Sequence, residues 1–373
     1  MTAIVAAGVI ATVALGLFVR SGPRGTLAID SLPAPVASEA ELAQSDDAVV
    51  FQPADLEPLP TTKVIGGPSP VLPNTSATAI LVATNTDLYL IDLVDGSSRS
   101  FRLPDALITD GPVSMFLVGD TVIISGYDVV ILLSGDDLRS TRIASPHYAL
   151  QTIADSSVWL LATGQSNSTR TALRVDLDGK IRDRVVVPAV IEPTAGTADL
   201  LVASTPGGLN LLTGDGVNSQ TLSGRMIAVG DGRLARVECT ADPTCHVVVG
   251  TFENPDQVWA QFATNEVPGS AGSLAGQFSP NGRWLALPLY PVDARGAHGL
   301  VTISIIDTVN GVEVGREESN STRSFFVGHM AWTPDSRWLV LSTNNGLKAW
   351  HAGQRRTVIL DVNIPDVGGV VVR

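Results

Sequence analysis

The sequence predicts an all-β fold of the β-propeller class, and three observations lead to this prediction. One ten-residue stretch occurs twice, as FSPNGRWLAL from Phe278 to Leu287 and as WTPDSRWLVL from Trp332 to Leu341. Turns of a second type recur at intervals that are multiples of about 42 to 44 residues. The composition is rich in Val, Ile, Thr and Gly and poor in helix-forming runs, which favours strands and turns.

The repeated stretch has the composition of a tight turn followed by a strand. Proline presets φ at the first corner of both turns, and Asn281 or Asp335 suits the second corner. Gly282 takes a positive φ without steric cost, whereas Ser336 does so less well. The alternating runs RWLAL and RWLVL that follow are typical of half-buried strands. Two copies of one supersecondary unit indicate a repeat protein.

The second type of turn sets the period of the repeat. It follows a hydrophobic strand that ends in Asp, and it has Asp-Gly or Asn-Gly character. The turn positions, some of them degraded, are Gly96, Gly135, Gly179, near Gly214, near Asn254, Gly311 and Gly353. A period of about 40–45 residues with four short antiparallel strands predicts seven blades, with six or eight as alternatives. We interpret the strand-end aspartates as turn and cap residues rather than as catalytic acids.

These motifs resemble those of the bacterial WD40-like (PD40, TolB-like) propeller repeats. The resemblance rests on the two FSPNGRWLAL-type stretches and on the IDLVDG turn of Ile91–Gly96. The two best copies cover only the last third of the chain, and Asn281 and Ser336 depart from the usual Pro-Asp-Gly. The Gly-His and Trp-Asp dipeptides of the eukaryotic WD40 repeat are mostly missing. The resemblance implies a propeller fold, but it does not imply a function, because propellers serve both as binding scaffolds and as enzymes.

The chain divides into three predicted parts. Residues 1–20 contain the uncharged apolar run Ala3–Val19 and are predicted to be an N-terminal transmembrane anchor, with a cleaved signal peptide as the alternative. Residues 21–75 are predicted to be an extended Pro-rich acidic linker. Residues 76–373 are predicted to form the propeller. A short strand near Lys63–Ile65 is a further expectation.

The orientation of the anchor rests on two opposing signals. Arg20 and Arg24 follow the apolar run, and the positive-inside rule would place them in the cytoplasm. The two cysteines of the chain, Cys239 and Cys245, flank an Asp-Pro turn between two strand-like segments. This hairpin predicts a disulfide and hence an oxidising compartment, with two unpaired thiols as the alternative. We give the disulfide more weight and expect a membrane-anchored propeller outside the cytoplasm, in a bacterial cell envelope.

Charge and motif spacing exclude several functions. The formal net charge of -13 and the pI of about 4.7 disfavour a nucleic-acid partner. The five histidines are scattered, and the chain has no HExxH, GxSxG or Walker spacing. We therefore assign no catalytic residue, no cofactor and no metal site. His329 precedes an inner strand, so it either faces the channel or is hydrogen-bonded within the structure.

The candidate binding site lies in loops that join the second and third strands of a blade. These loops share a face with the connections between blades, and three are elaborated, at residues 164–170, 239–245 and 288–299. The last two belong to neighbouring blades. Insertions into a repeat are where function concentrates. The candidate binding-face residues of the longest loop are Tyr290, Asp293, Arg295 and His298.

Three hypotheses about function follow. The first is a membrane-tethered extracytoplasmic propeller, expected to be monomeric, that binds an unknown protein or cell-envelope component without catalysis. The second is an extracytoplasmic propeller enzyme, a glycan hydrolase or lyase, which predicts converging carboxylates at the axis. The third is a propeller that faces the cytoplasm, which predicts free thiols at Cys239 and Cys245.

Overall fold

A computed structural model describes the propeller part of the chain. The described residues are 51–53, 56–59, 72–84, 86–104, 114–126, 128–135, 138, 140–144, 146–154, 156–162, 169–188, 191–205, 208–213, 218–230, 232–239, 245–254, 260–264, 267–268, 276–290, 301–318, 329–343, 346–360, 362, 364 and 367–373. Every described residue belongs to the second of the chain's two units, Ser45–Arg373. The predicted anchor at 1–20 and the predicted strand at Lys63–Ile65 lie outside the described residues.

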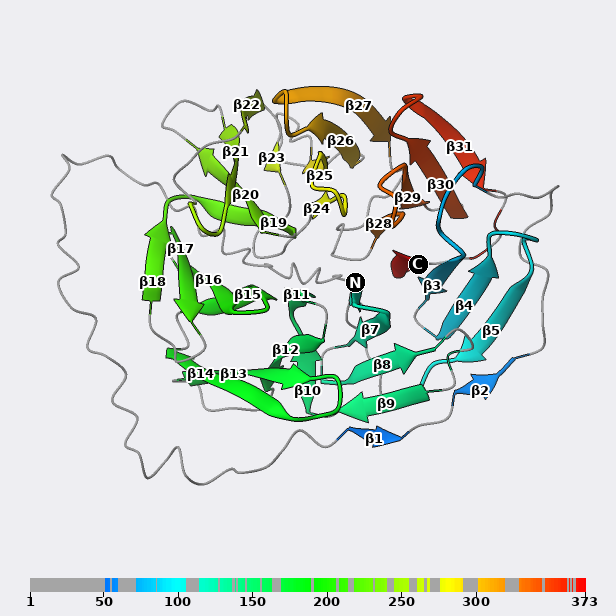
Figure 1. Ribbon diagram of the computed structural model, residues 1–373, viewed down its shortest axis with the longest axis horizontal. Coiled ribbons are helices and arrows are strands. Elements are labelled where there is room, and N and C mark those ends of the chain that lie inside the picture. The colour runs from blue at the N-terminus through cyan, green and yellow to red at the C-terminus, as the bar shows by residue number, and fades with distance from the viewer. Residues whose placement is uncertain are drawn as a thin grey trace, which may run out of the picture. The chain divides into compact units, whose positions relative to one another are not determined.

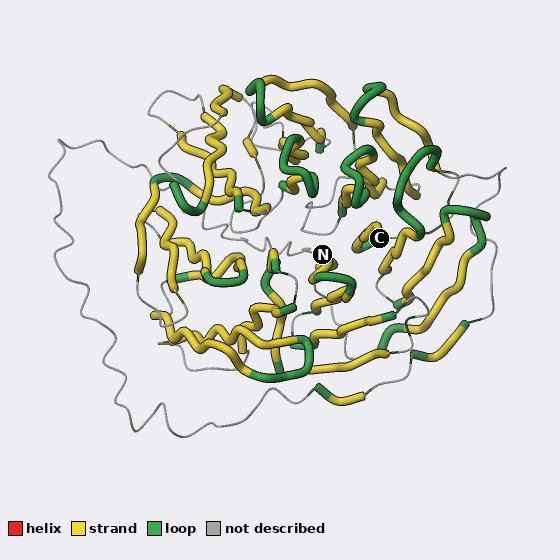
Figure 2. Tube along the Cα trace, viewed as in Figure 1, coloured by secondary structure: helices red, strands yellow, loops and turns green. Residues whose placement is uncertain are grey.

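The second unit is a seven-bladed β-propeller, as the sequence predicts. Its strands form seven mainly antiparallel sheets, arranged as a ring in Figure 1, and the described residues contain no helix (Figure 2). Each turn position of the predicted period falls between the third and fourth strands of a blade. The periodic turns therefore located all seven blades.

The first four blades, named in chain order, have these strands from the inside outward. Blade 1 has β32 (Gly369–Val372), β3 (Ala79–Ala83), β4 (Asp87–Asp92), β5 (Ser98–Arg102) and β2 (Glu57–Pro58). Blade 2 has β6 (Ser114–Val118), β7 (Thr121–Ser125), β8 (Val130–Ser134), β9 (Ser140–Ala144) and β1 (Gln52–Pro53). Blade 3 has β10 (His147–Ala149), β12 (Ser157–Ala162), β13 (Thr169–Asp176) and β14 (Ile181–Pro188). Blade 4 has β11 (Gln151–Ile153), β15 (Glu192–Thr197), β16 (Leu200–Thr205), β17 (Gly208–Thr213) and β18 (Asn218–Leu222).

The last three blades follow the same plan. Blade 5 has β19 (Arg225–Gly230), β20 (Arg233–Cys239), β21 (Cys245–Thr251) and β22 (Ala260–Thr264). Blade 6 has β23 (Val267–Pro268) and β24 (Gln277–Phe278), both paired with β25 (Trp284–Tyr290), then β26 (Thr302–Asp307) and β27 (Val312–Glu318). Blade 7 has β28 (Met330–Trp332), β29 (Trp338–Thr343), β30 (Gly346–His351) and β31 (Arg356–Leu360).

Both copies of the repeated stretch form the predicted turn between the first and second strands of a blade. In blade 6, Gly282 N–H donates to Ser279 O at 2.7 Å, and Gly282 has a φ of 66°. In blade 7, Ser336 N–H donates to Thr333 O at 2.8 Å, and Ser336 has a φ of 60° although it is not glycine. The Ser336 hydroxyl accepts a hydrogen bond from Asn281 N–H at 3.1 Å, so this serine also links the two blades.

The strand-end aspartates stabilise the turns between the third and fourth strands, as predicted. Asp92 Oδ1 accepts from Val94 N–H at 2.7 Å, and Asp307 Oδ1 accepts from Val309 N–H at 3.0 Å. Such side-chain acceptors satisfy main-chain donors that a sharp turn leaves unpaired.

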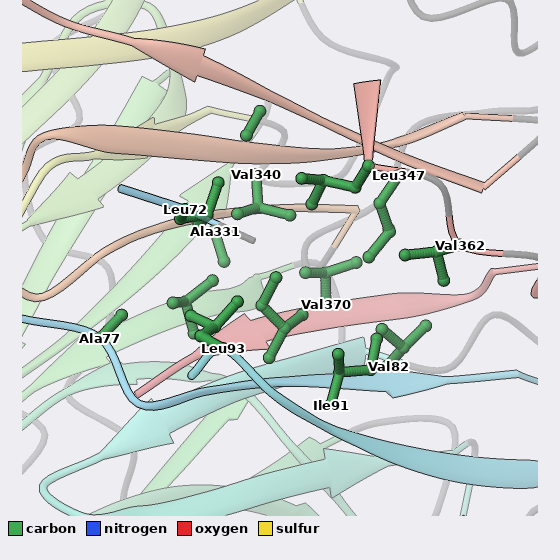
Figure 3. Packing of buried hydrophobic residues seen from close by; sticks show 14 of the residues in the cluster. Leu72, Ala77, Val82, Ile91, Leu93, Ala331, Val340, Leu347, Val362 and Val370 are labelled. Atoms are coloured by element: carbon green, nitrogen blue, oxygen red, sulfur yellow. The ribbon is translucent and has the colours of Figure 1, made fainter. Parts of the chain in front are cut away.

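The hydrophobic core lies between the blades rather than in one central mass. Among the described residues there are seven buried clusters, and each fills the space between two consecutive blades. Figure 3 shows the cluster between blades 7 and 1, where Val340 and Leu347 face Val82, Ile91 and Val370. This cluster closes the ring, because β32 from the end of the chain pairs with β3 near its start.

Part of the predicted linker is bound to the propeller. We call residues 51–59 the rim segment. Within it, β1 pairs antiparallel with β9 of blade 2, and β2 pairs antiparallel with β5 of blade 1. Phe51 and Leu56 pack against the clusters beneath these two outer strands. Both edge strands contain a proline, which cannot offer a further backbone donor at an exposed sheet edge.

Candidate functional site

The three predicted loops do join the second and third strands of their blades. They connect β12 to β13 in blade 3, β20 to β21 in blade 5, and β25 to β26 in blade 6. Blades 5 and 6 are neighbours, so the strand ends that lead into these two loops lie on one face of adjacent blades. Asp293, Arg295 and His298 lie outside the described residues. Tyr290 is the last residue of β25 and is the partner of Val267, and its side chain is likewise outside the described part.

The cysteine hairpin has the strand register that its predicted disulfide requires. Cys239 ends β20, Cys245 begins β21, and the two residues are direct partners in an antiparallel pair. Direct antiparallel partners have Cα atoms about 4.5–5.5 Å apart, within the range for a disulfide. The side chains of both cysteines lie outside the described residues, so the disulfide stays a prediction.

Three polar side chains of blade 5, those of Arg236, Glu238 and Ser223, are hydrogen-bonded to one another next to the cysteine pair. Arg236, which is only 5% exposed, donates through Nε to Glu238 Oε1 at 2.9 Å, and the Ser223 hydroxyl donates to the same oxygen at 2.6 Å. Burial pushes the pKa of Glu238 upward, but the hydrogen bonds from Ser223 and Arg236 outweigh it and hold this pKa below its usual value. The arrangement fixes the base of the hairpin.

A second candidate site is the central channel, a cavity of about 470 Å³. Six of the seven blades contribute described residues to it, mainly through their innermost strands and the residues that follow them, and the described strands of blade 3 contribute none. The residues that line it are Met115, Phe116, Leu117, Gln151, Thr152, Ile153, Ala154, Ala198, Val229, Gly230, Gln277, Phe278, Ser279, Pro280, Ala331, Trp332, Val370, Val371 and Val372. Its size is within the range of about 300–1,000 Å³ typical of small-molecule sites.

Most side chains of this lining are apolar, and the polar ones are the amides of Gln151 and Gln277 and the hydroxyls of Thr152 and Ser279, which are hydrogen-bonded within the protein. No charged side chain occurs among the described lining residues, so the carboxylates that the enzyme hypothesis predicts are not found among them. Gln151 is 7% exposed, and its Oε1 is buried without a hydrogen-bond partner in the described structure. The same holds for Oε1 of Gln277. An unpaired buried acceptor costs about 1–3 kcal/mol, so each amide oxygen favours an added donor.

Inner strands of blades 5 and 6 approach one another closely beside the channel. A Cβ on Gly230 of β19 would lie 2.8 Å from Cβ of Phe278 on β24, closer than real Cβ atoms come. Glycine thus lets Phe278 reach the axis between blades 5 and 6. Trp332 is held in place by its Nε1–H, which donates to the main-chain oxygen of Gln277 at 3.2 Å.

Sequence reasoning did not identify the channel residues. Gln151 belongs to a run that changes partner at Leu150: β10 pairs antiparallel with β12 of blade 3, whereas β11 pairs in parallel with β15 of blade 4. Such a switch leaves no signal in the strand pattern. Gln277 did carry a signal in the sequence. It directly precedes the first copy of the repeated stretch, and the equivalent residue before the second copy is Ala331. A polar residue in one repeat and alanine in the other marks a position with a different role.

His329 is a structural residue. Its Nδ1 lies 3.0 Å from the hydroxyl of Ser342 on β29, and burial lowers its pKa to about 4. It does not belong to the channel lining. The hydrogen-bonded alternative is therefore confirmed.

The described residues contain neither a cluster of metal ligands nor a membrane-spanning helix. No three His, Cys, Asp or Glu side chains among them gather as metal ligands do. Nor does this part of the chain contain a helix with the length and hydropathy of a membrane span.

Comparison with known proteins adds a likeness of fold. No protein-family model and no curated protein matches the sequence. Among solved structures, apo AztD from Citrobacter koseri has a TM-score of 0.48 and 12% identity, covering 79% of this chain and 97% of that one. Hydrazine synthase from Kuenenia stuttgartiensis has a TM-score of 0.47 and 14% identity, covering 68% and 82%. Hsv2 from Kluyveromyces lactis has 0.45 and 14%, covering 67% and 78%. At these identities and TM-scores the likenesses carry no argument about function.

Proposed function

We propose that the protein is a membrane-tethered extracytoplasmic propeller that binds a protein or cell-envelope component without chemistry of its own. The observation that carries this proposal is the position of two elaborated hairpins. β20–β21 and β25–β26 are the second and third strands of neighbouring blades, so the strand ends that lead into their loops are adjacent on one face. A pair of adjacent irregular loops on a rigid ring is a common basis for recognition.

Blade 5 supports its hairpin with polar side-chain contacts. Arg236 and Ser223 both donate to Glu238 beneath the cysteine pair, and Glu238 is the partner of His246 across the hairpin. A preorganised loop loses less conformational entropy on binding than a free one. The apolar run Ala3–Val19 supports the tether, and the residues up to the rim segment would provide the spacer.

The test is site-specific photocrosslinking with the full chain in its native membrane. A photoreactive residue replaces His298 in the β25–β26 loop in one variant. In a matched control it replaces Val94, which is 71% exposed in a turn between the third and fourth strands of blade 1. We expect a discrete cross-linked species from position 298 and none from position 94.

Charge reversal in the same loop tests specificity. Arg295→Glu should reduce the cross-link yield at position 298, whereas Arg356→Glu, on the exposed outer strand of blade 7, should leave it unchanged. Equal labelling at positions 298 and 94, or a yield that does not respond to Arg295→Glu, would contradict the proposal.

A further inference from the structure

We propose that the central channel is a second binding site, specific for a neutral, largely apolar small molecule that carries a hydrogen-bond donor. This site is separate from the loop face. Its described lining comes from inner strands and the turns that follow them, in six of the seven blades. A cavity of about 470 Å³ is large enough for a compact ligand.

The apolar lining determines the charge and polarity of the ligand. Phe278 and Trp332 supply aromatic surface from blades 6 and 7, and Met115 and Val370 supply aliphatic surface from blades 2 and 1. A charged ligand would lose its hydration in this channel and would meet no charged side chain among the described lining residues. The lining therefore favours a neutral molecule whose body is apolar.

The two glutamines determine the polar group of the ligand. Gln151 belongs to blade 4 and Gln277 to blade 6, so the two residues line the channel from different blades. Both amide oxygens are buried without a hydrogen-bond partner in the described structure. The indole N–H of Trp332 does not satisfy the Gln277 amide oxygen, because it donates to the main-chain carbonyl of Gln277. Rotation about the last side-chain bond, which is a soft torsion, turns an amide oxygen toward a donor in the channel.

A matched set of three fluorescent probes tests each part of this proposal on the full-length protein. 7-Amino-4-methylcoumarin is neutral and carries an N–H donor. 7-Dimethylamino-4-methylcoumarin is neutral without a donor, and 7-aminocoumarin-4-acetic acid is an anion at neutral pH. In anisotropy titrations we expect the amino probe to bind saturably, the dimethylamino probe to bind about tenfold more weakly, and the anion not to bind.

Three variants locate the binding. Gln151→Leu and Gln277→Ala should each reduce the preference for the amino probe over the dimethylamino probe, and alanine is tolerated at the second position because Ala331 occupies it in blade 7. Ala198 is an exposed lining residue of the β15–β16 turn, so Ala198→Trp should block both neutral probes. Val94→Trp adds the same side chain outside the channel and should have no effect.

The outcomes separate this site from the loop face. Ala198→Trp should leave cross-linking at position 298 intact, so the failure of one proposal is distinguishable from the failure of the other. The channel proposal is overturned if no probe binds saturably to the wild type, if the anion binds as well as the amino probe, or if Ala198→Trp leaves probe binding unchanged. It is also overturned if neither glutamine variant alters the probe preference while both retain the wild-type unfolding midpoint.

Discussion

At the scale of single residues, contacts between blades depend on a large side chain that packs against a glycine of the next blade. Trp159 of blade 3 covers Gly196 of blade 4, and its Nε1–H donates to Thr197 O at 2.9 Å. A Cβ at Gly196 would lie 2.0 Å from Cδ1 of Trp159. Because interiors are close-packed, the indole has no free space into which it can move.

Gly196→Ala should therefore destabilise the propeller by about 2–3 kcal/mol through overpacking. Urea unfolding with an unchanged m-value measures this loss. Gly368→Ala is the matched control, since a Cβ there meets only Ala83 O at an ordinary 3.5 Å, and its effect should stay within about 0.5 kcal/mol. Equal losses of stability in the two variants would show that overpacking of Gly196 against Trp159 does not cause the destabilisation.

His329 should make the stability of the propeller depend on pH. Burial lowers its pKa from 6.5 to about 4, so between these values the unfolded chain binds a proton that the folded chain does not. The stabilisation is complete above about pH 6.5 and is lost as the pH falls toward about 4. From about pH 7.5 to about pH 5, the wild type should lose about 2 kcal/mol more than His329→Gln.

The measurement is urea unfolding of both proteins at the two pH values. His147, whose pKa is also lowered by burial, is present in both and cancels in the comparison. An equal loss in wild type and variant would mean that His329 is protonated in the folded state.

Residues whose type fixes a local geometry could be predicted from the sequence, whereas channel residues could not. The turns at Gly282 and Ser336 were predicted because proline, Asn or Asp, and a small residue determine backbone angles locally. Gln151 and Gln277 line the channel for a reason that is not local. Which side of an inner strand faces the channel depends on how all the blades pack, and alternation along a strand does not reveal it.

At the scale of elements, the ring is closed within blade 1, where a strand from the C-terminal end of the described residues pairs with a strand near their N-terminal end. β32 forms four residue pairs with β3, Ile80–Val372 through Ala83–Gly369. Residues 72–78 add contacts to blade 7, where Pro73 O accepts from Trp338 Nε1–H at 3.2 Å and Ser76 N–H donates to Asp335 Oδ2 at 2.9 Å. The rim segment then covers the outer edges of blades 1 and 2.

Removing β32 should have a larger effect than removing the rim segment. A chain that ends at Gly368 leaves β3 with an unpaired edge and exposes the cluster of Figure 3, so it should lose cooperative unfolding. Of the described residues, a chain that begins at Leu72 lacks only the rim segment with its two edge strands, so it should unfold cooperatively at a lower midpoint. Tryptophan fluorescence during urea unfolding distinguishes them, and a wild-type transition in the chain lacking β32 would refute this account of closure.

The seven four-stranded blades could be predicted because each repeats one turn at a regular interval, but the added strands could not. β1 and β2 have two residues each, and β11 has three. Strands this short have no hydrophobic period to detect. They form because each pairs with the edge strand of a blade, and the sequence of these segments does not show that such an edge is available. Residues 51–59 were therefore predicted as part of the linker, although they belong to the surface of the propeller.

At the scale of the whole molecule, the compartment of the propeller determines the state of its cysteines. We predict that protein isolated without reductant resists thiol alkylation at Cys239 and Cys245 until it is reduced, which mass spectrometry detects as a mass difference. Replacing both by serine should lower stability by about 2 kcal/mol, as expected for a short closed loop. The untreated serine variant is the control for alkylation elsewhere. Full alkylation of the native protein before reduction would favour the cytoplasmic alternative.

The pairing of β32 with β3 also governs the order in which the protein folds. The innermost strand of blade 1 comes from residues 369–372, whereas the rest of that blade comes from residues 79–102 and the rim segment. A contact between segments so far apart in the chain raises the contact order and slows folding. During synthesis, blades 2 to 7 can pair their own strands as they emerge, but blade 1 keeps an open edge until residues 369–372 have been synthesised. The first blade to be synthesised is thus the last to be completed.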